Sequence, residues 1–310
     1  MPRPGFLMTI GAWNPPTGLP SELFKSFMYT SFVSNYPRSI NTYLSVLIYR
    51  LGKHLYLVPR LNAVDFLSII GELTRKRIEA LRAGVRAPSM VKAIEGRNSE
   101  GYLALIAEYK RASPSGVIRL DLDPWTYFNH ISQYATGFSV LVEPFYFLGS
   151  PIFVKVALTY GKPVLYKDFV ISKEQVREAR ELGASSVLLI KRLLGNSLWE
   201  LADYAMSLGL EPLIEVDNEA DAMEVINANP NIMLGINSRD LGDLSVSLDR
   251  AVSIIRAVRG RADIIIAESG VKNASDASRL AREGANAVLV GTALMRNMEL
   301  ARELSSVAIK

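Results

Sequence analysis

From residue 102 to the end of the chain, short runs of apolar residues alternate with amphipathic stretches. The runs are continuously apolar, which is typical of parallel strands that are covered on both faces. The stretches between them, such as 172–183, repeat their apolar residues at helical spacing. The pattern predicts strands at 102–108, 138–143, 163–167, 186–190, 211–216, 232–237, 263–268 and 286–291.

Strands and helices that alternate eight times over about 210 residues predict an α/β fold, a (β/α)8 TIM barrel with an N-terminal helical extension, because a doubly wound sheet usually has fewer strands. We place the catalytic barrel at 102–310 and the extension at 64–101. A helix with one buried face is expected first, ending near Gly84 before Pro88, and a second helix over 89–95. Both helices are expected to pack on the barrel. The apolar residues that predict the buried face are Phe66, Leu67, Ile69, Ile70, Leu73, Ile78 and Leu81.

Residues 1–63 differ in composition from the rest of the chain. They carry six basic residues against a single acidic one, Glu22, whereas the remainder is close to neutral. A targeting presequence, a membrane or partner anchor and a mis-assigned start are the interpretations to weigh. The uncharged window 39–49 is too short for the roughly 20 residues that span a bilayer. We favour a mis-assigned start or a dispensable extension, poorly ordered in either case, so that a chain starting at Val64 folds and stays active. The neutral body gives no reason to expect nucleic-acid binding.

The residue types present limit the chemistry. Cysteine is absent and the chain has two histidines, His54 and His130. These counts exclude a disulfide framework, thiolate metal sites, a cysteine nucleophile and a histidine-rich metal site. In an enzyme of this composition that uses no cofactor, Lys, Glu, Asp, Tyr or Ser must move the protons.

Polar residues end most of the predicted strands, at the face where barrel enzymes carry their chemistry. One such residue is usually an ordinary solvated loop residue, but the barrel would gather all of them at one mouth. Glu215 inside an apolar strand would be costly unless it were paired or functional. The glycine-containing loops 268–270 and 291–293 follow the last two strands, where barrels commonly bind phosphate. The residues of this mouth are Glu108, Lys110, Lys167, Glu215, Asn237, Ser238, Arg239, Glu268, Ser269, Gly270, Gly291 and Thr292.

Several motifs closely resemble indole-3-glycerol phosphate synthase, an enzyme family of tryptophan biosynthesis. The first-strand motif IAEYKRASPSG (106–116) is specific to that family, and the other motifs follow in the family's order. They are LYKDF (165–169), LGASSVLLI (182–190), EPLIEV (211–216), GINSRDL (235–241), AESGV (267–271) and VLVGTALMR (288–296). The resemblance covers about 64–310 and leaves the first 63 residues without a counterpart.

The resemblance implies a cytoplasmic carbon–carbon lyase. Its reaction closes 1-(2-carboxyphenylamino)-1-deoxyribulose 5-phosphate to indole-3-glycerol phosphate with loss of CO2 and water. No cofactor or metal is implied, and the partners are the small-molecule substrate and possible other enzymes of the tryptophan pathway. Lys167 matches the general acid for the ketone oxygen, Glu108 and Glu215 match acid–base carboxylates, and Lys110 matches the partner of the substrate carboxylate. The substrate-binding positions are Ser113, Phe147, Phe169, Leu188, Asn237, Arg239, Glu268 and Leu289, and the phosphate-binding positions are Ser269, Gly270, Gly291 and Thr292.

These assignments carry physical expectations. Burial and neighbours would tune the pKa of Lys167 toward neutrality, with Asp168 helping to hold its charge. Gly270 and Gly291 would present backbone N–H groups to the phosphate, so that a side chain there would clash with the phosphate and raise KM.

The chain departs from the family pattern at two places, Leu148 in the loop after the second strand and Lys191 after the fourth. Lys191 could add charge at the rim of the pocket. Two other functions are open: another phosphate-binding barrel enzyme such as a sugar-phosphate isomerase, and a non-catalytic barrel that binds a phosphate ligand. The intact set of glutamates and lysines argues against the second, and the lack of cysteine against isomerases that use Cys and Asp.

Overall fold

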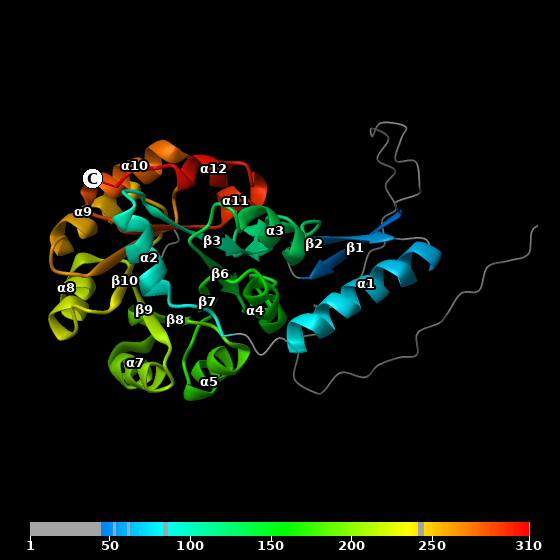
Figure 1. Ribbon diagram of the computed structural model, residues 1–310, viewed down its shortest axis with the longest axis horizontal. Helices are drawn as coiled ribbons and strands as arrows, with labels where there is room; N and C mark the ends of the chain where they lie inside the picture. Colours follow the sequence, from blue (N-terminus) through cyan, green and yellow to red (C-terminus); the bar gives the residue numbers. More distant parts are fainter. Residues whose placement is uncertain (1–44, 52–53, 61–62, 83–85, 241–244, 310) are drawn as a thin grey trace, which may run out of the picture. The chain divides into compact units, whose positions relative to one another are not determined.

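Eight parallel strands close into a barrel in the part of the chain that begins at Leu67 (Figure 1). The predicted (β/α)8 TIM barrel is thereby confirmed. The computed structural model describes residues 45–51, 54–60, 63–82, 86–240 and 245–309. Around the barrel the strands follow the order β10-β11-β12-β3-β6-β7-β8-β9. They are β3 (Ala104–Tyr109), β6 (Gly137–Leu141), β7 (Val164–Lys167), β8 (Ser186–Ile190), β9 (Glu211–Val216), β10 (Met233–Asn237), β11 (Ile264–Glu268) and β12 (Ala287–Val290).

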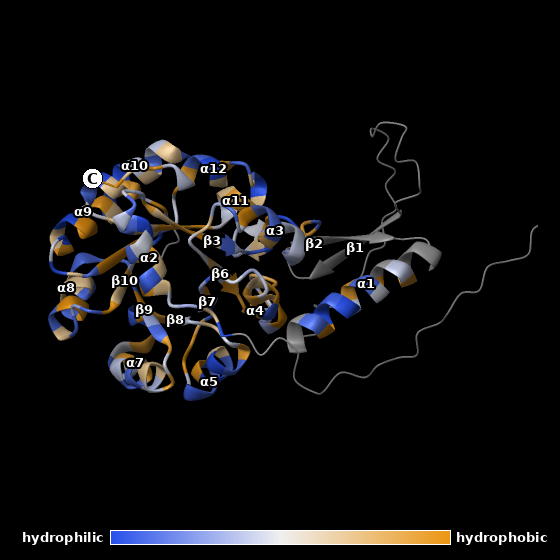
Figure 2. Ribbon diagram, viewed as in Figure 1, coloured by the Kyte–Doolittle hydropathy of each residue, from blue (hydrophilic) through white to orange (hydrophobic). Residues whose placement is uncertain are grey.

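Helices follow the strands and cover the outside of the barrel. Their apolar residues face the strands and their polar residues face solvent, so that both hydrophobic and hydrophilic faces appear on the ribbons in Figure 2. The helix expected over 172–183 is α5, which ends before Gly183 in the left-handed region at φ +94°. The helices are α3 (Pro124–Ile131), α4 (Pro151–Leu158), α5 (Lys173–Leu182), α6 (Lys191–Leu194), α7 (Leu198–Ser207), α8 (Glu219–Ala228), α9 (Leu248–Val258), α10 (Ala274–Glu283), α11 (Thr292–Arg296) and α12 (Leu300–Ser305).

The strands are buried on both faces, which explains why their sequences read as continuous apolar runs. One hydrophobic cluster lies between the strands and the surrounding helices. A second cluster fills the inside of the barrel, with Ile106 from β3, Leu165 from β7 and Leu213 from β9 among its members. The interior is therefore a packed core that forms the floor beneath the carboxyl ends of the strands.

Helix α2 (Met90–Ser99) covers the amino ends of the strands and matches the helix expected over 89–95. Its side chains Met90 and Ile94 are buried in the inner cluster. The first turn is held by Glu211 at the start of β9, whose carboxylate accepts hydrogen bonds from the Ser89 hydroxyl at 2.5 Å and from the Met90 N–H at 2.7 Å. Because α2 seals this end, the opposite end of the barrel is the open one.

Helix α1 (Ala63–Arg82) forms where the apolar spacing predicted a helix. The predicted buried face is wrong at Leu67, Ile70 and Ile78, whose side chains are exposed. Gly84, expected to end the helix, lies outside the described residues.

Strands β1 (Ser45–Leu51) and β2 (His54–Arg60) form an antiparallel pair that the apolar pattern did not predict. The two strands pair along their whole length, from Ser45 opposite Arg60 to Leu51 opposite His54. The expectation of poor order for residues 1–44 concerns residues outside the described part. Within the described part of the chain, no helix is both long and apolar enough to cross a membrane.

Candidate active site

The open end of the barrel holds a cavity of about 1140 Å³. Every residue predicted for the site lines this cavity except Ser238 and Glu268, which are fully buried. The barrel topology therefore brings together side chains from strands β3, β7, β8, β9, β10 and β12, which lie far apart in the sequence. The Glu268 carboxylate lies 2.6 Å from the Lys167 ammonium, and its contact with the substrate stays a prediction.

A cluster of charged side chains forms the floor of the cavity. The Lys167 ammonium lies 2.6 Å from Glu268, 3.2 Å from Glu108 and 4.0 Å from Glu215. A second ammonium, on Lys110, lies 2.6 Å from the other oxygen of Glu108. All three carboxylates are buried, and the Lys167 side chain is only 15% exposed. The arrangement places one buried cation among three carboxylates, where proton affinities depend strongly on neighbours.

The same contacts separate the proton affinities of these groups. Burial raises the pKa of Glu108, but Lys110 and Lys167 outweigh burial and lower that pKa to about 2. Burial and the neighbouring Glu268 raise the pKa of Glu215 to about 8, against the opposing effects of Lys167 and Asn237. One carboxylate is therefore ionised at neutral pH and another protonated, which is the pattern of a paired base and acid.

Lys167 differs from its expectation. Burial lowers its pKa, but the three carboxylates more than compensate, and the pKa lies above the ordinary value for lysine. The expected tuning toward neutrality is therefore wrong. Asp168 does not hold the charge either, because its carboxylate accepts hydrogen bonds from Gln175 at 3.0 Å and from the Tyr166 hydroxyl at 3.4 Å.

Apolar side chains form one wall of the cavity. The rings of Phe147 and Phe169 lie 5.8 Å apart between centroids at an angle of 41°. Leu188 on β8 and Leu289 on β12 are buried in the inner cluster beneath them. These four residues come from four different segments, as predicted, and they line a space that suits a flat aromatic ring.

The loop after β6 carries Phe147 and is braced from within. The Glu143 carboxylate accepts backbone N–H bonds from residues 145, 146 and 147 at 2.7–3.0 Å. Leu148, which departs from the family pattern, takes a left-handed backbone conformation at φ +53°. Its carbonyl accepts two hydrogen bonds from the Arg111 guanidinium, at 2.6 and 2.9 Å. Ser113 ends the short strand β4 (Ala112–Ser113), which follows Arg111 and pairs with β5 (Gly116–Val117).

Two loops that line the cavity carry the residues predicted for the phosphate site. After β11, Ser269 and Gly270 both adopt positive φ angles, +66° and +80°. Serine rarely takes this conformation, so the turn is held by its surroundings, including the Ser238 hydroxyl, which donates to the Ser269 carbonyl at 3.2 Å. After β12, Gly291 and Thr292 begin helix α11. All four residues line the cavity.

Gly291 has a role that the sequence did not indicate. Its φ of −114° is open to any residue, so its backbone does not require glycine. A Cβ at this position would meet Glu108, lying 3.0 Å from its Cδ and 3.2 Å from its Cβ. A side chain here would therefore meet Glu108, and its clash with the phosphate stays a prediction. Gly235 has the same relation to Glu268, whose Oε1 would lie 2.5 Å from an added Cβ.

The rim near β8 differs from its expectation as well. Lys191 does not add charge to the cavity, because its ammonium pairs with Glu224 on α8 at 2.7 Å. Its neighbour Arg192 lines the cavity instead, and sequence reasoning did not identify it. The direction of a side chain on a helix as short as α6 depends on its partners, which the sequence does not display.

Comparisons with known proteins agree with this geometry. A family model described as indole-3-glycerol phosphate synthase matches residues 67–307. An indole-3-glycerol phosphate synthase from Pyrobaculum aerophilum is 45% identical over 249 residues, covering 79% of this chain and 97% of that protein. One from Pyrobaculum neutrophilum is 49% identical over 209 residues, covering 67% and 83%. A tryptophan synthase structure from M. tuberculosis shares only the fold, with a TM-score of 0.51 and 14% identity over 71% of this chain and all of that one.

Proposed function

The chain belongs to the indole-3-glycerol phosphate synthase family, and on that premise we propose how its cavity carries out the reaction. The reaction closes 1-(2-carboxyphenylamino)-1-deoxyribulose 5-phosphate to indole-3-glycerol phosphate and releases CO2 and water. The observation that carries the proposal is the buried Lys167 ammonium, which three carboxylates surround at 2.6–4.0 Å on the cavity floor.

At one end of the substrate is a flat aromatic ring that bears a carboxylate, and at the other end is the phosphate of the sugar chain. We place the ring against Phe147, Phe169, Leu188 and Leu289, and its carboxylate near Lys110. The phosphate lies at the loops after β11 and β12, where Ser269, Gly270, Gly291 and Thr292 are, with Asn237 and Arg239 along the sugar chain. This orientation matches apolar surface with the ring, and cation or N–H groups with the anions.

Ring closure comes first. The ring carbon that bears the carboxylate attacks the ketone carbon, and the ketone oxygen takes a proton from Lys167. An alkoxide forming in the transition state is more basic than an amine, so a lysine with a raised pKa can still donate to it. The raised pKa also keeps the proton on Lys167 until that charge develops. Loss of CO2 then restores the aromatic ring.

Dehydration follows. Glu215, protonated at neutral pH, donates to the departing hydroxyl, which leaves as water. Glu108 takes the proton from the ring carbon next to nitrogen, and it becomes a stronger base once Lys167 has lost its charge. The proton on Glu108 can return to Lys167 across their 3.2 Å contact. One proton from solvent restores Glu215, which balances the single proton that decarboxylation consumes.

The experiment is direct turnover. The purified chain is mixed with the carboxyphenylamino-deoxyribulose phosphate, and indole fluorescence and CO2 release are followed together. We expect one CO2 per indole formed, and a rate of indole formation at least about 10²-fold lower with Lys167→Met. CO2 release without indole, or neither product from the wild-type chain, would contradict the proposal.

Membership of the family also supports proposals about residues 1–101, the location of the protein and its partners. We propose that residues 1–63 are dispensable for catalysis, because the family match begins at residue 67. We propose that 64–101 pack on the barrel, which the burial of Met90 and Ile94 supports for α2. We propose a cytoplasmic location, because substrate and product are phosphate esters, which do not cross membranes unaided. Other enzymes of tryptophan biosynthesis would share that compartment, and we propose them as partners.

A further inference from the structure

Two neighbouring cations on the short helix α6 point in different directions. Lys191 pairs with Glu224 on the outer helix α8. Arg192 extends over the mouth of the barrel, where it donates to Asp217 at 2.8 Å and lies 3.5 Å from Asp240. Asp217 immediately follows β9, and Asp240 follows β10. Arg192 therefore joins the loops that follow three successive strands.

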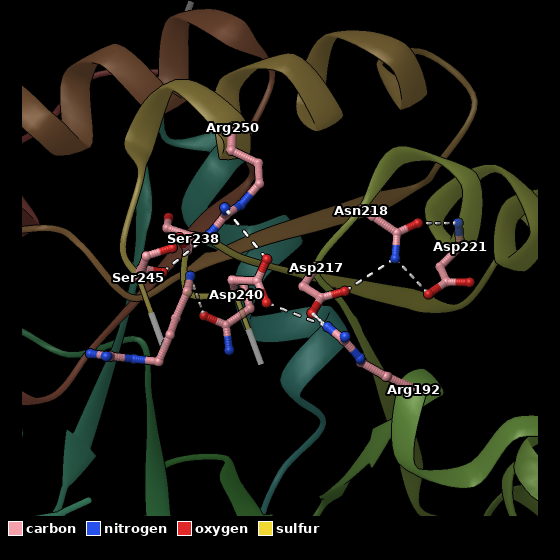
Figure 3. Close-up of polar contacts among 10 residues, drawn as sticks. Arg192, Asp217, Asn218, Asp221, Ser238, Asp240, Ser245 and Arg250 are labelled. Carbon is pink, nitrogen blue, oxygen red and sulfur yellow. Dashed lines mark hydrogen bonds and ion pairs between the residues drawn. The ribbon is translucent and has the colours of Figure 1, made fainter. Parts of the chain in front are cut away.

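These contacts continue into a chain of alternating charges, shown in Figure 3. The second oxygen of Asp240 lies 3.8 Å from the Arg250 guanidinium on α9. We name the sequence Asp217–Arg192–Asp240–Arg250 the rim chain. Its first member is almost fully buried, and the other oxygen of Asp217 accepts a hydrogen bond from Asn218 at 3.1 Å. Asn218 in turn caps helix α8, accepting from the Asp221 N–H at 2.9 Å. The rim chain is thus anchored in a helix cap.

The far end of the rim chain contacts the described residues on either side of 241–244, Ser238 and Asp240 before them and Ser245 after them. The Arg250 guanidinium donates to the Ser238 carbonyl at 2.9 Å and to the Ser245 carbonyl at 3.2 Å, joining the two sides of the loop. The Asp240 N–H donates to the Ser245 carbonyl at 2.8 Å. Between these contacts, the Arg239 N–H donates to the Asn237 side-chain oxygen at 2.9 Å.

That hydrogen bond connects the loop with the cavity floor. It fixes the orientation of the Asn237 amide, because the oxygen is used by Arg239 and the NH2 group faces the other way. Glu215 on β9 pairs with Gly235 on the neighbouring strand β10, so that Asn237, two residues further along β10, lies on the same face, and both side chains line the cavity. The Asn237 amide also lowers the pKa of Glu215. A displacement of the loop would therefore turn the amide away from the carboxyl that we assign to dehydration.

We propose that Arg192 is a positioning residue, which acts through the rim chain to hold Asn237 against Glu215. The inference rests on the proposed function of Glu215. A direct contact between Arg192 and the substrate is the competing role, since Arg192 lines the cavity. Two carboxylates already contact its guanidinium, so little of its charge is left to attract the carboxylate or phosphate of the substrate.

The test is a double-mutant cycle with separate kcat and KM. We expect Arg192→Met to lower kcat about tenfold, the scale on which small misplacements reduce rates, and to leave KM within about twofold. In an Asn237→Ala background the same substitution should change kcat less than about twofold, because the residue it acts through is gone. Lys191→Met is the matched control on the same helix, and it should leave both constants unchanged.

Two results would overturn the inference. A large rise in KM with unchanged kcat would make Arg192 a substrate contact, and equal losses in both backgrounds would show that it acts independently of Asn237. Removing Arg192 alone takes away a cation that contacts the buried Asp217, which is destabilising. If Arg192→Met does not fold, the double substitution Arg192→Met with Asp217→Asn removes both charges and should show the same kcat loss. A wild-type chain without turnover would contradict the proposed function, whereas wild-type turnover with unaffected Arg192→Met would overturn only this inference.

Discussion

Replacing Gly291 with alanine separates two explanations for this glycine. The added Cβ would approach Oε1 of Glu108 and lie 3.0 Å from its Cδ. Glu108 has little freedom to move, because it is buried and its two oxygens contact Lys110 at 2.6 Å and Lys167 at 3.2 Å. Relief of the contact must therefore displace Glu108 from at least one lysine.

The size of the effect follows from the bond at risk. A buried hydrogen bond to a charged group contributes about 1.5–3 kcal/mol. If Gly291→Ala loses one such bond in the transition state, kcat falls about 10- to 150-fold, since about 1.4 kcal/mol corresponds to a factor of ten. KM should change little, because the three heavy atoms nearest to the added Cβ all belong to Glu108.

The assay is steady-state turnover followed by indole fluorescence, with kcat and KM determined separately. Gly96→Ala is the matched control: it lies in α2, its Cβ would meet no atom within 4 Å, and it should leave both constants unchanged. A large rise in KM for Gly291→Ala with near-normal kcat would refute the reasoning, and would restore the explanation that the glycine makes room for the phosphate.

Three further predictions concern charge, the closed end of the barrel and the extension. Burial and Glu268 raise the pKa of Glu215 from 4.5 to about 8, so the unfolded chain loses this proton at a lower pH than the folded chain does. As the pH rises from about 4.5 to 8, urea titrations should therefore show the wild type losing stability relative to Glu215→Gln. Loss of the same proton from the folded enzyme should make wild-type kcat/KM decline above about pH 8. Glu211→Ala should lower the free energy of unfolding by about 1–3 kcal/mol and leave kcat unchanged, because it leaves the first turn of α2 without its acceptor at the end opposite the cavity; equal stability of variant and wild type would contradict this. A chain starting at Val64 should melt cooperatively and keep wild-type kcat; loss of cooperative melting would make 1–63 part of the fold.

Much of the site was predictable because the barrel topology brings the residues at the carboxyl ends of the strands to one cavity. Once the strands are identified, their carboxyl ends must meet, whatever the separation in sequence. Glu108, Lys167 and Glu215 therefore converge on one cavity floor as expected. The aromatic wall of Phe147 and Phe169 likewise follows from the positions of two loops that succeed neighbouring strands.

The properties that depend on distance were not predictable. Whether Lys167 gains or loses proton affinity depends on the balance between burial and three carboxylates, and only their spacing decides it. The spacing also shows that the buried Glu268 pairs with Lys167, and that a Cβ at Gly291 would meet Glu108. Arg192 was missed because its partners come from the loops after two other strands.

The account depends most on Lys167 as the proton donor. Three carboxylates surround the Lys167 ammonium and stabilise its positive charge. A variant with a positive charge at this position that cannot give up its proton therefore tests proton transfer separately from charge. Arginine does so, because its pKa lies above about 12 in proteins. The decisive measurement is kcat of Lys167→Arg beside that of Lys167→Met. The account predicts that both fall by at least about 10²-fold, the scale of general-acid contributions, with smaller changes in KM. A Lys167→Arg enzyme with near-normal kcat would contradict it, and would assign proton donation to a glutamate of the cluster.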